Sequence, residues 1–330
     1  MNDIAAVYQN KNVLVIGGRG FVGGHLVERL LELGAEVFVL DDDSHPSSAP
    51  VNEAAAQYTG DAGDEQELLR VYNTALPDFI FNLAAKVAGV LYNEDHHLEM
   101  FENNMPCQMV PLRTSQYVPG KAPAYLHVSS VCVYGQGETS PCNDRFTPRL
   151  PPTGANAGYS WSKRIGELYA GWLPEPQQPV IVRPTNMYGP WDHFGPDSHV
   201  IPAFIERVHR SPFRMTIFGT GREIREFIYV TDAVEGMLYA LAFGKRGEVY
   251  NIGTNGQTMI DTRDLARLIA ATLGVKGQLL LYDDSKGGGD ESRYTDCQRL
   301  NALGFKHQVS LEAGIKKTVE WYLANISDGR

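Results

Sequence analysis

The feature that most constrains the fold is a glycine-rich turn close to the N-terminus, placed between an apolar run and a helix-like segment. Val13–Ile16 is a short apolar run of the kind that forms a buried parallel strand, and it leads directly into the sequence GGRGFVG. Leu26, Leu30 and Leu33 then recur at helical spacing, and Gly34 follows as a helix stop. A strand, a glycine turn and a helix in this order predict the first unit of a dinucleotide-binding α/β fold.

The residues of this turn have separate expected tasks. Gly17, Gly20 and Gly23 allow a tight turn, a close approach of backbone to a pyrophosphate, and close packing of helix on strand. Phe21 and Val22 lie in the first helical turn, where backbone N–H groups have no partner within the helix. These N–H groups and the positive end of the helix dipole favour a bound phosphate.

Acidic residues at the end of the second expected strand and in the later stretch TGDAGD indicate which dinucleotide is preferred. Asp41 ends the apolar run Glu36–Leu40, where a carboxylate accepts hydrogen bonds from both ribose hydroxyls and repels a 2′-phosphate. This favours NAD over NADP, although Arg19 in the glycine turn could reach a 2′-phosphate. Asp61 could bind the adenine amine or simply cap its own loop.

The rest of the chain continues the alternation of strands and helices. Further strands are expected at Phe79–Leu83, Tyr125–Ser129 and Val180–Arg183, and helices at Thr231–Phe243 and Leu311–Leu323. We therefore predict a doubly wound parallel sheet of the Rossmann type with a smaller C-terminal lobe. Residues 1–183 and about 229–250 would form the dinucleotide-binding domain, and 184–228 and about 251–330 the substrate lobe. The glycine-rich Lys286–Asp290 is interpreted as a surface loop or a lid.

Composition excludes several classes of function. The chain has 330 residues and a formal net charge of −10 without a basic block, so nucleic acid is not an expected partner. It contains no apolar run long enough for a membrane span, and residues 1–18 do not have the pattern of a signal peptide. Its four cysteines are dispersed without a CxxC pair, which favours a reduced, cytoplasmic setting. No metal site is expected, because His96 and His97 point to different helix faces.

Three residues form a candidate catalytic group. Tyr159 and Lys163 are four residues apart, so they share one face of a helix. A nearby ammonium is expected to lower the pKa of the phenol, which could then take a proton from a sugar hydroxyl. Ser130 follows the Tyr125–Ser129 strand and could hydrogen-bond to the same hydroxyl.

A set of ordered motifs carries a family resemblance. GGRGFVG, Asp41, NLAA, SSVCVYG, YSWSK, RPTNMYGP and REFIYVTD follow one another along nearly the whole chain. This set resembles the extended short-chain dehydrogenase/reductase family of nucleotide-sugar enzymes. The resemblance implies that Ser130, Tyr159 and Lys163 are the catalytic triad and that Ala84 contacts the cofactor. It further implies a homodimer built from two helices, one of which carries YSWSK.

The resemblance also implies a set of substrate contacts. Arg225 would bind the substrate diphosphate through charged, fork-like hydrogen bonds. Asn186 would contact the sugar nucleotide, and Arg293 is either a second phosphate contact or a surface arginine. Lys86, in the stretch AAKVAGV, matches the fucose-synthase loop AAKVGG and would face the substrate. GDP is the nucleotide that this resemblance favours.

The residues at positions 132 and 199 limit which nucleotide-sugar reaction the resemblance implies. Val131-Cys132 stands where the dehydratases of this family carry an Asp-Glu pair, which disfavours 4,6-dehydration. The pattern SxCxY instead resembles GDP-fucose synthases and GDP-mannose 3,5-epimerases, in which the cysteine exchanges protons beside a ketone. His199, in SHVIPA, matches the histidine that fucose synthases pair with that cysteine. Oxidation at C4 acidifies the C3 and C5 protons, and Cys and His both titrate close enough to neutrality to move them.

These residues lead to one main hypothesis and several alternatives. The main hypothesis is an NAD-dependent epimerase that oxidises C4 of a GDP-mannose-like hexose or heptose, inverts C3, C5 or both, and reduces C4 again. The alternatives are an NADPH-dependent 4-keto-6-deoxy sugar epimerase/reductase, a nucleotide-sugar 4-epimerase or decarboxylase, and a catalytically idle dinucleotide sensor. The complete Ser130, Tyr159 and Lys163 set argues against the sensor.

Overall fold

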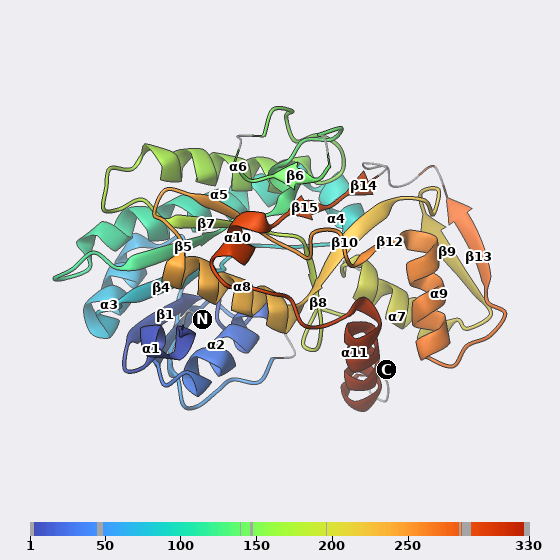
Figure 1. Cartoon of the computed structure of the whole chain (residues 1–330), viewed down its shortest axis with the longest axis horizontal. Helices are drawn as coiled ribbons and strands as arrows, with labels where there is room; N and C mark the ends of the chain where they lie inside the picture. The colour runs from blue at the N-terminus through green and yellow to red at the C-terminus, as the bar shows by residue number, and fades with distance from the viewer. Residues whose placement is uncertain are drawn as a thin grey trace.

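The computed structural model describes residues 3–44, 49–138, 140–145, 148–195, 197–283, 285 and 292–326. Its centre is a parallel sheet of seven strands in the order β11-β7-β5-β4-β1-β2-β3 (Figure 1). The strands are β1 (Asn12–Ile16), β2 (Glu36–Asp41), β3 (Ala56–Thr59), β4 (Phe79–Asn82), β5 (Ala124–Val128), β7 (Val180–Pro184) and β11 (Val249–Ile252). The strand order reverses at β1, and ligands of open α/β sheets bind at such a reversal. The predicted doubly wound sheet is confirmed.

The first strand shows why the sheet is covered on both faces. Val13 and Val15 belong to one hydrophobic cluster, and Leu14 and Ile16 belong to another on the opposite face. All four side chains are fully buried. Because successive strand side chains alternate between faces, a continuous apolar run requires a layer of helices on each side.

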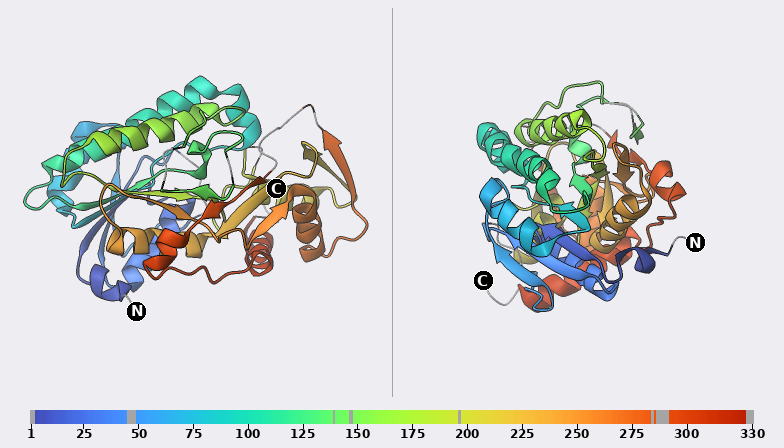
Figure 2. Two further views of the ribbon diagram at one scale, coloured as in Figure 1. Left: turned by 45° about the horizontal axis from the view of Figure 1, so that its top comes forward. Right: turned by 90° about the vertical axis from the view of Figure 1, so that its left-hand side faces the viewer.

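The two helical layers are drawn from different parts of the chain. One face carries α1 (Ile4–Tyr8), α2 (Phe21–Glu32) and α8 (Val230–Phe243). The other carries α3 (Glu65–Ala75), α5 (His97–Thr114) and α6 (Ala157–Trp172). Figure 2 shows α5 and α6 side by side along this face. The layer of α5 and α6 brings Tyr159 and Lys163 to the carboxyl end of β5.

The smaller lobe has its own hydrophobic cluster and is built from short elements (Figure 1). Its strands are β8 (Asn186–Tyr188), β9 (Arg214–Phe218), β10 (Ile224–Tyr229), β12 (Met259–Asp261), β13 (Leu279–Asp283) and β14 (Ser292–Arg293). Its helices are α7 (Val200–Arg210), α9 (Thr262–Thr272) and α11 (Leu311–Asn325). β10 is the central strand, because β8, β12 and β14 all pair with it.

Several segments join the two parts. β10 runs directly into α8, so the central strand of the smaller lobe continues into a helix that covers the large sheet. α10 (Gln298–Ala302) returns to the large sheet late in the chain, and Leu300 and Phe305 are buried in the same cluster as α8. The short pair β6 (Cys142–Asn143) and β15 (Thr295–Asp296) lies beside β11. The predicted loop at Lys286–Asp290 lies outside the described residues.

Candidate active site

The glycine turn has the geometry that its sequence predicts. Gly17 has a φ of +79°, and a Cβ on it would lie 2.9 Å from the backbone nitrogen of Ala84. A Cβ on Gly23 would lie 2.1 Å from the Gly17 carbonyl oxygen. Gly20 caps α2 without any side-chain hydrogen bond, so the N–H groups of Phe21 and Val22 point out of an uncapped helix end. Glycine at positions 17 and 23 therefore lets the backbone pack closely into a cradle, and the uncapped N–H groups of α2 suit a bound phosphate.

Asp41 is joined to the glycine turn by hydrogen bonds. Its carboxylate accepts one bond from the backbone N–H of Arg19 at 2.9 Å and another from that of Asp43 at 3.0 Å. The Arg19 guanidinium is 2.6 Å from the Asp43 carboxylate and also donates to Gln57 and Thr59. Its positive charge is thus already paired at the end of β2.

Asp61 serves its own loop in this structure. Its Oδ1 accepts a hydrogen bond from the backbone N–H of Gly63 at 2.7 Å, and its side chain is exposed. This is the loop-capping geometry that the sequence allowed as one of two possibilities.

Four predicted residues meet at the end of β5. Ser130 caps the short 3₁₀ turn η2 (Val131–Val133), and its Oγ accepts a hydrogen bond from the backbone N–H of Cys132 at 3.2 Å. The Ser130 side chain and the Cys132 thiol both lie close enough to Tyr159 to influence its phenol. The Lys163 Nζ is 5.7 Å from the centre of the Tyr159 ring. The helix α6 and the turn after β5 therefore place a hydroxyl, a thiol, a phenol and an ammonium in one cluster.

Burial controls the electrostatics of this cluster. Burial raises the pKa of Tyr159 and the nearby Cys132 adds to this, while the hydrogen bond with Ser130 acts in the opposite direction. Burial lowers the pKa of Lys163 to about 8, against opposing effects of Cys107, Glu167 and Cys132. The expected lowering of the phenol pKa by Lys163 is therefore wrong for this structure. The Lys163 ammonium donates to the Val128 carbonyl at 2.8 Å, and desolvation of the phenol dominates.

Sequence reasoning missed the residues that hold this cluster in place. Ser129 Oγ donates to Glu167 at 2.5 Å, and Glu167 forms a buried, two-pronged ion pair with Arg183 at 2.6 and 2.9 Å. Arg183 also donates to the Tyr134 hydroxyl at 2.9 Å. Glu167 follows Lys163 by four residues on the same helix face, and this spacing was the available signal.

The predicted phosphate-binding arginines lie side by side. β10 and β14 pair in parallel with Arg225 opposite Arg293, so both side chains leave the same face of the sheet. Behind them Glu226 is fully buried, and its carboxylate accepts hydrogen bonds from Thr254 and Thr295. Neighbouring guanidinium groups on one sheet face can bind a diphosphate through charge-assisted hydrogen bonds.

The remaining predicted substrate residues have partners within the protein. Asn186 is exposed on β8, and its Nδ2 donates to the Glu226 carbonyl at 2.8 Å. Lys86 forms an ion pair with Glu99, and its ammonium lies 5.5 Å from the centre of the Tyr92 ring. The hydrogen bond with Glu99 raises the pKa of Lys86. Lys86 therefore remains charged, with its ammonium directed to Glu99 in this structure.

His199 comes from a separate segment of the smaller lobe. It caps α7, and its side chain is 45% exposed. Its Nδ1 lies 3.7 Å from the carboxylate of Asp192, which sequence reasoning did not single out. Partial burial opposes protonation of the ring, but Asp192 outweighs this and raises the pKa of His199.

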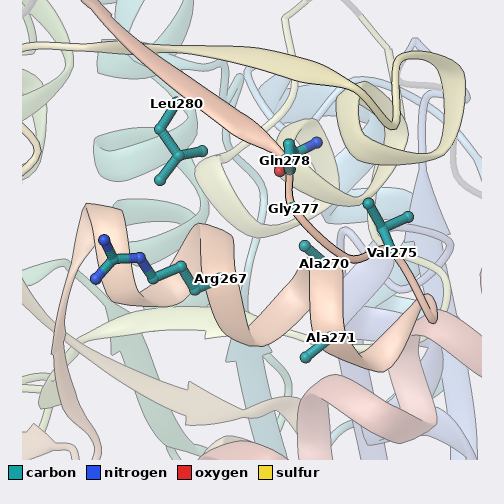
Figure 3. Close-up of a pocket in the computed structure, with 7 residues that line it drawn as sticks. All are labelled: Arg267, Ala270, Ala271, Val275, Gly277, Gln278 and Leu280. Atoms are coloured by element: carbon teal, nitrogen blue, oxygen red, sulfur yellow. The ribbon is translucent and has the colours of Figure 1, made fainter.

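Two other features lie outside this site. A hollow of about 280 Å³ lies between α9 and the start of β13, lined by Arg267, Ala270, Ala271, Val275, Gly277, Gln278 and Leu280 (Figure 3). None of the predicted site residues lines this hollow. Within the described ranges no group of three His, Cys, Asp or Glu side chains is arranged to hold a metal ion. No helix in the described part of the chain is long and apolar enough to cross a membrane.

The glycine turn lies where the strand order of the parallel sheet reverses, and the Ser130–Tyr159–Lys163 cluster lies at the end of β5. Together these features define a dinucleotide-dependent enzyme that acts on a hydroxyl-bearing carbon. Comparison with known proteins agrees with this class. The chain matches the family described as "NAD dependent epimerase/dehydratase family" over residues 13–253, and it belongs to that family. It is thus an enzyme of the extended short-chain dehydrogenase/reductase type, as its motifs predict.

The relatives span several nucleotide-sugar reactions. "GDP-L-fucose synthase 1" of Arabidopsis thaliana is 29% identical over 332 residues, covering 96% of this chain and 95% of the relative. "Probable dTDP-glucose 4,6-dehydratase" of Sinorhizobium fredii is 30% identical over 338 residues, covering 95% and 93%. The structure of UDP-glucose 4-epimerase from Thermotoga maritima with UDP-glucose aligns with a TM-score of 0.84 at 28% identity, covering 96% of this chain and 99% of that one.

Proposed function

We propose that this enzyme is an NAD-dependent nucleotide-sugar epimerase that inverts C3, C5 or both after transient oxidation of C4. The observation that carries the proposal is Cys132, which sits in the Ser130–Tyr159–Lys163 cluster rather than in a remote part of the core. A thiol at this position is suited to moving a proton on a carbon next to the oxidised one. His199 is the proposed second proton-exchanging group.

The residues of the glycine turn suit a bound dinucleotide. A side chain at Gly17 or Gly23 would collide with the backbone of the turn, Gly20 caps α2 without a side-chain hydrogen bond, and the N-terminus of α2 is uncapped. Together with Phe21, Val22, Asp41, Asp61 and Ala84, they are the residues proposed to hold NAD. When bound, NAD accepts a hydride from C4 of the sugar and returns it.

The chain's own residues are proposed to carry the proton steps. Tyr159 takes the C4 hydroxyl proton as the hydride leaves, and Ser130 hydrogen-bonds to the same oxygen. Lys163 supplies positive charge beside the phenolate that forms. Cys132 and His199 then remove a proton from one face of the carbon beside the ketone and return one to the opposite face. The electron pair of the broken C–H bond is held as the enolate of the C4 ketone between these two transfers.

NAD is favoured over NADP by the charges at the carboxyl end of β2. The Asp41 carboxylate at the glycine turn would repel a 2′-phosphate, and the Arg19 charge that could attract one is paired with Asp43. Fluorescence titration of the protein with NADH and with NADPH checks this. Tighter binding of NADPH would contradict the assignment.

A second candidate function is supported by the relatives. GDP-L-fucose synthases are similar to this chain over nearly its whole length. A 4-keto-6-deoxy sugar epimerase/reductase would use the same Cys132 and His199 and would finish by a net reduction of C4. Consumption of NADPH absorbance with a 4-keto-6-deoxy sugar nucleotide would favour this candidate over the self-contained epimerase.

The proposed substrate is a nucleotide-diphosphate sugar, with GDP favoured. Arg225 and Arg293 are proposed to bind its diphosphate, and Asn186, His199 and Lys86 its sugar end. The proposed division places 1–183 and about 229–250 around the dinucleotide, and 184–228 and about 251–330 around the nucleotide sugar.

The proposed assembly is a homodimer formed through α5 and α6. Large apolar side chains on these helices are exposed, with Leu98 69% and Trp172 77% accessible in the single chain. A cytoplasmic location is proposed because Cys107, Cys132, Cys142 and Cys297 are all free thiols.

The function is tested by variants of the two proposed proton carriers. Cys132→Ser and His199→Asn should each lower formation of C3- or C5-inverted product by about a hundredfold or more, which is the contribution typical of a general acid or base. Cys107→Ser is the matched control, because this thiol on α5 donates to the Asn103 carbonyl at 3.5 Å and is not a proposed proton carrier. Full epimerase activity in both Cys132→Ser and His199→Asn would refute the proposal.

A further inference from the structure

The segment that carries His199 contains a buried carboxylate with an unmet hydrogen-bonding capacity. Asp192 is 2% exposed. Its Oδ1 accepts one hydrogen bond, from the backbone N–H of His193 at 2.8 Å, and its Oδ2 has no partner. Because a buried carboxylate without partners is unfavourable, such a group is retained where it serves a neighbouring cation or donor. The His199 Nδ1, 3.7 Å from Asp192 Oδ1, is that neighbour.

The backbone of this segment is held in a costly conformation next to Asp192. Trp191 has a φ of +69°, a left-handed value that is uncommon for a residue other than glycine or asparagine. Its ring stacks on His25 of α2 with centroids 4.0 Å apart, and the His25 Nε2 is hydrogen-bonded to the Pro190 carbonyl at 3.0 Å. The helix that begins at the glycine turn therefore fixes the position of Asp192.

The other side of the segment is anchored as well. The backbone N–H of Gly89 donates to the Asp197 carbonyl at 2.6 Å, and a Cβ on Gly89 would lie 2.5 Å from the Ser198 carbonyl oxygen. Ser198 Oγ donates to the Gly195 carbonyl at 2.7 Å. Asp192 and His199 are thus held from both sides, so their separation is set by the fold.

We propose that Asp192 is a positioning residue for His199, which accepts the Nδ1 proton of the ring and leaves Nε2 as the nitrogen that exchanges a proton with the sugar. This inference rests on the proposed function in so far as His199 faces a reacting carbon. When Nε2–H donates its proton to carbon, the N–H bond breaks, the C–H bond forms, and the ring becomes neutral with Nδ1–H still directed at Asp192. The carboxylate stabilises the charged ring before the transfer and keeps a single tautomer after it.

The surrounding titratable groups leave Asp192 as the charged partner of His199 among the described residues. Asp192 is the group that raises the pKa of the ring, against the effect of partial burial. Burial lowers the pKa of His25, which keeps that ring neutral.

The other titratable groups around His199 lie in its own segment and on the adjoining helices. His193 and Asp197 lie in the same segment, and Asp197 is exposed. On the adjoining helices, Glu206 pairs with Arg210 at 2.8 Å and Tyr322 packs on Phe194.

The first test uses the native full-length protein. ¹⁵N-histidine labelling and two-dimensional NMR report which ring nitrogen carries the proton, and a His199→Gln variant assigns the signal. We expect Nδ1 to be protonated in neutral His199. A neutral ring protonated at Nε2, or a mixture of both tautomers, would overturn the inference without any need for an Asp192 variant.

The second test compares Asp192→Asn with Asp197→Asn, which is the matched control in the same segment. In Asp192→Asn the pKa of His199 should fall, and solvent exchange at the sugar carbon at pH 8 should drop about ten- to a hundredfold, the range seen when a carboxylate that orients a functional imidazole is removed. The loss should be smaller at pH 6, where a larger fraction of the ring is charged in both proteins than at pH 8. A structural defect alone would lower the rate equally at both pH values.

The outcomes separate this inference from the proposed function. If the native protein exchanges protons at C3 or C5 and Asp192→Asn keeps the same His199 pKa and the same pH profile, Asp192 is not a positioning residue and the function stands. If the native protein shows no exchange at all, the proposed function fails, and the NMR titration of His199 still decides the part played by Asp192.

Discussion

Removal of one partner from the buried Glu167–Arg183 ion pair should strongly destabilise the enzyme. The two side chains are 9% and 3% exposed, and the guanidinium binds the carboxylate through two bonds. Burial alone raises the pKa of Glu167, but Arg183 outweighs it and holds the pKa below its ordinary value. Glu167→Gln removes one charge and leaves the Arg183 charge buried without compensation. Breaking such a pair costs about 3–5 kcal/mol of unfolding free energy.

The assay is urea unfolding followed by circular dichroism, with a double-mutant cycle. Arg183→Gln should lose a similar amount, whereas the double variant Glu167→Gln/Arg183→Gln should lose far less than the sum, because no buried charge remains. Glu67→Gln is the matched control, since Glu67 pairs with Arg70 at the surface with exposures of 38% and 51%. It should cost less than about 1 kcal/mol.

Two results would refute this reasoning. One is a loss below about 1 kcal/mol for Glu167→Gln, which would place the pair in the range of surface ion pairs. The other is strict additivity in the double variant, which would mean that the two charges do not interact. Because Glu167 also accepts from Ser129, the residue before Ser130, we further expect Glu167→Gln to lower kcat at temperatures where the protein is folded.

Three further predictions follow from single positions. Gly23→Ala places a Cβ 2.1 Å from the Gly17 carbonyl oxygen, so NAD binding measured by calorimetry should weaken about tenfold or more; unchanged affinity would argue against the cradle. Burial lowers the Lys163 pKa from 10.5 to about 8, so charged Lys163 destabilises the fold below pH 8. Relative to Lys163→Met, the native protein should gain up to about 3 kcal/mol as pH rises from about 8 to about 10.5, where Lys163 is neutral in the folded state and still charged in the unfolded state. A flat difference in urea midpoints over this range would contradict it. Arg293→Gln should raise KM about tenfold with kcat nearly unchanged in steady-state assays, as expected for a lost charged hydrogen bond. An unchanged KM would mean that Arg293 is a surface arginine that does not contact the substrate.

The dinucleotide half of the fold was readable from sequence because its signals are local. The strand β1, the glycine turn and α2 occupy consecutive residues, and each has a strong periodic or conformational signature. Gly34, predicted as the helix stop, has a φ of +78°. By contrast β3 (Ala56–Thr59) is a short edge strand of mixed polarity, and its sequence carries no comparable pattern.

The arrangement of side chains in the site depended on long-range pairing that a sequence pattern does not encode. Arg225 and Arg293 become neighbours through the register of β10 on β14, across 68 positions of the chain. The Glu167–Arg183 pair joins a helix to a strand of the sheet. Asp192 lies in an irregular segment rich in glycine and proline, where no periodicity predicts burial.

The electrostatic expectation for Tyr159 failed for a related reason. The spacing to Lys163 is correct, and both residues lie in α6. However, spacing does not report how deeply a side chain is buried or where the lysine directs its hydrogen bonds. Here Val128 and Gln108 take those bonds, and burial raises the pKa of the phenol.

The most direct measurement is NMR of the sugar product after incubation in D₂O. The native enzyme would be given GDP-mannose with catalytic NAD and, separately, a 4-keto-6-deoxy sugar nucleotide. The account predicts deuterium at C3 or C5 without net reduction of the cofactor, because Cys132 and His199 return solvent-derived protons to the carbons that flank C4. Product altered only at C4, with no deuterium at C3 or C5 from either sugar, would contradict the assignment of both residues.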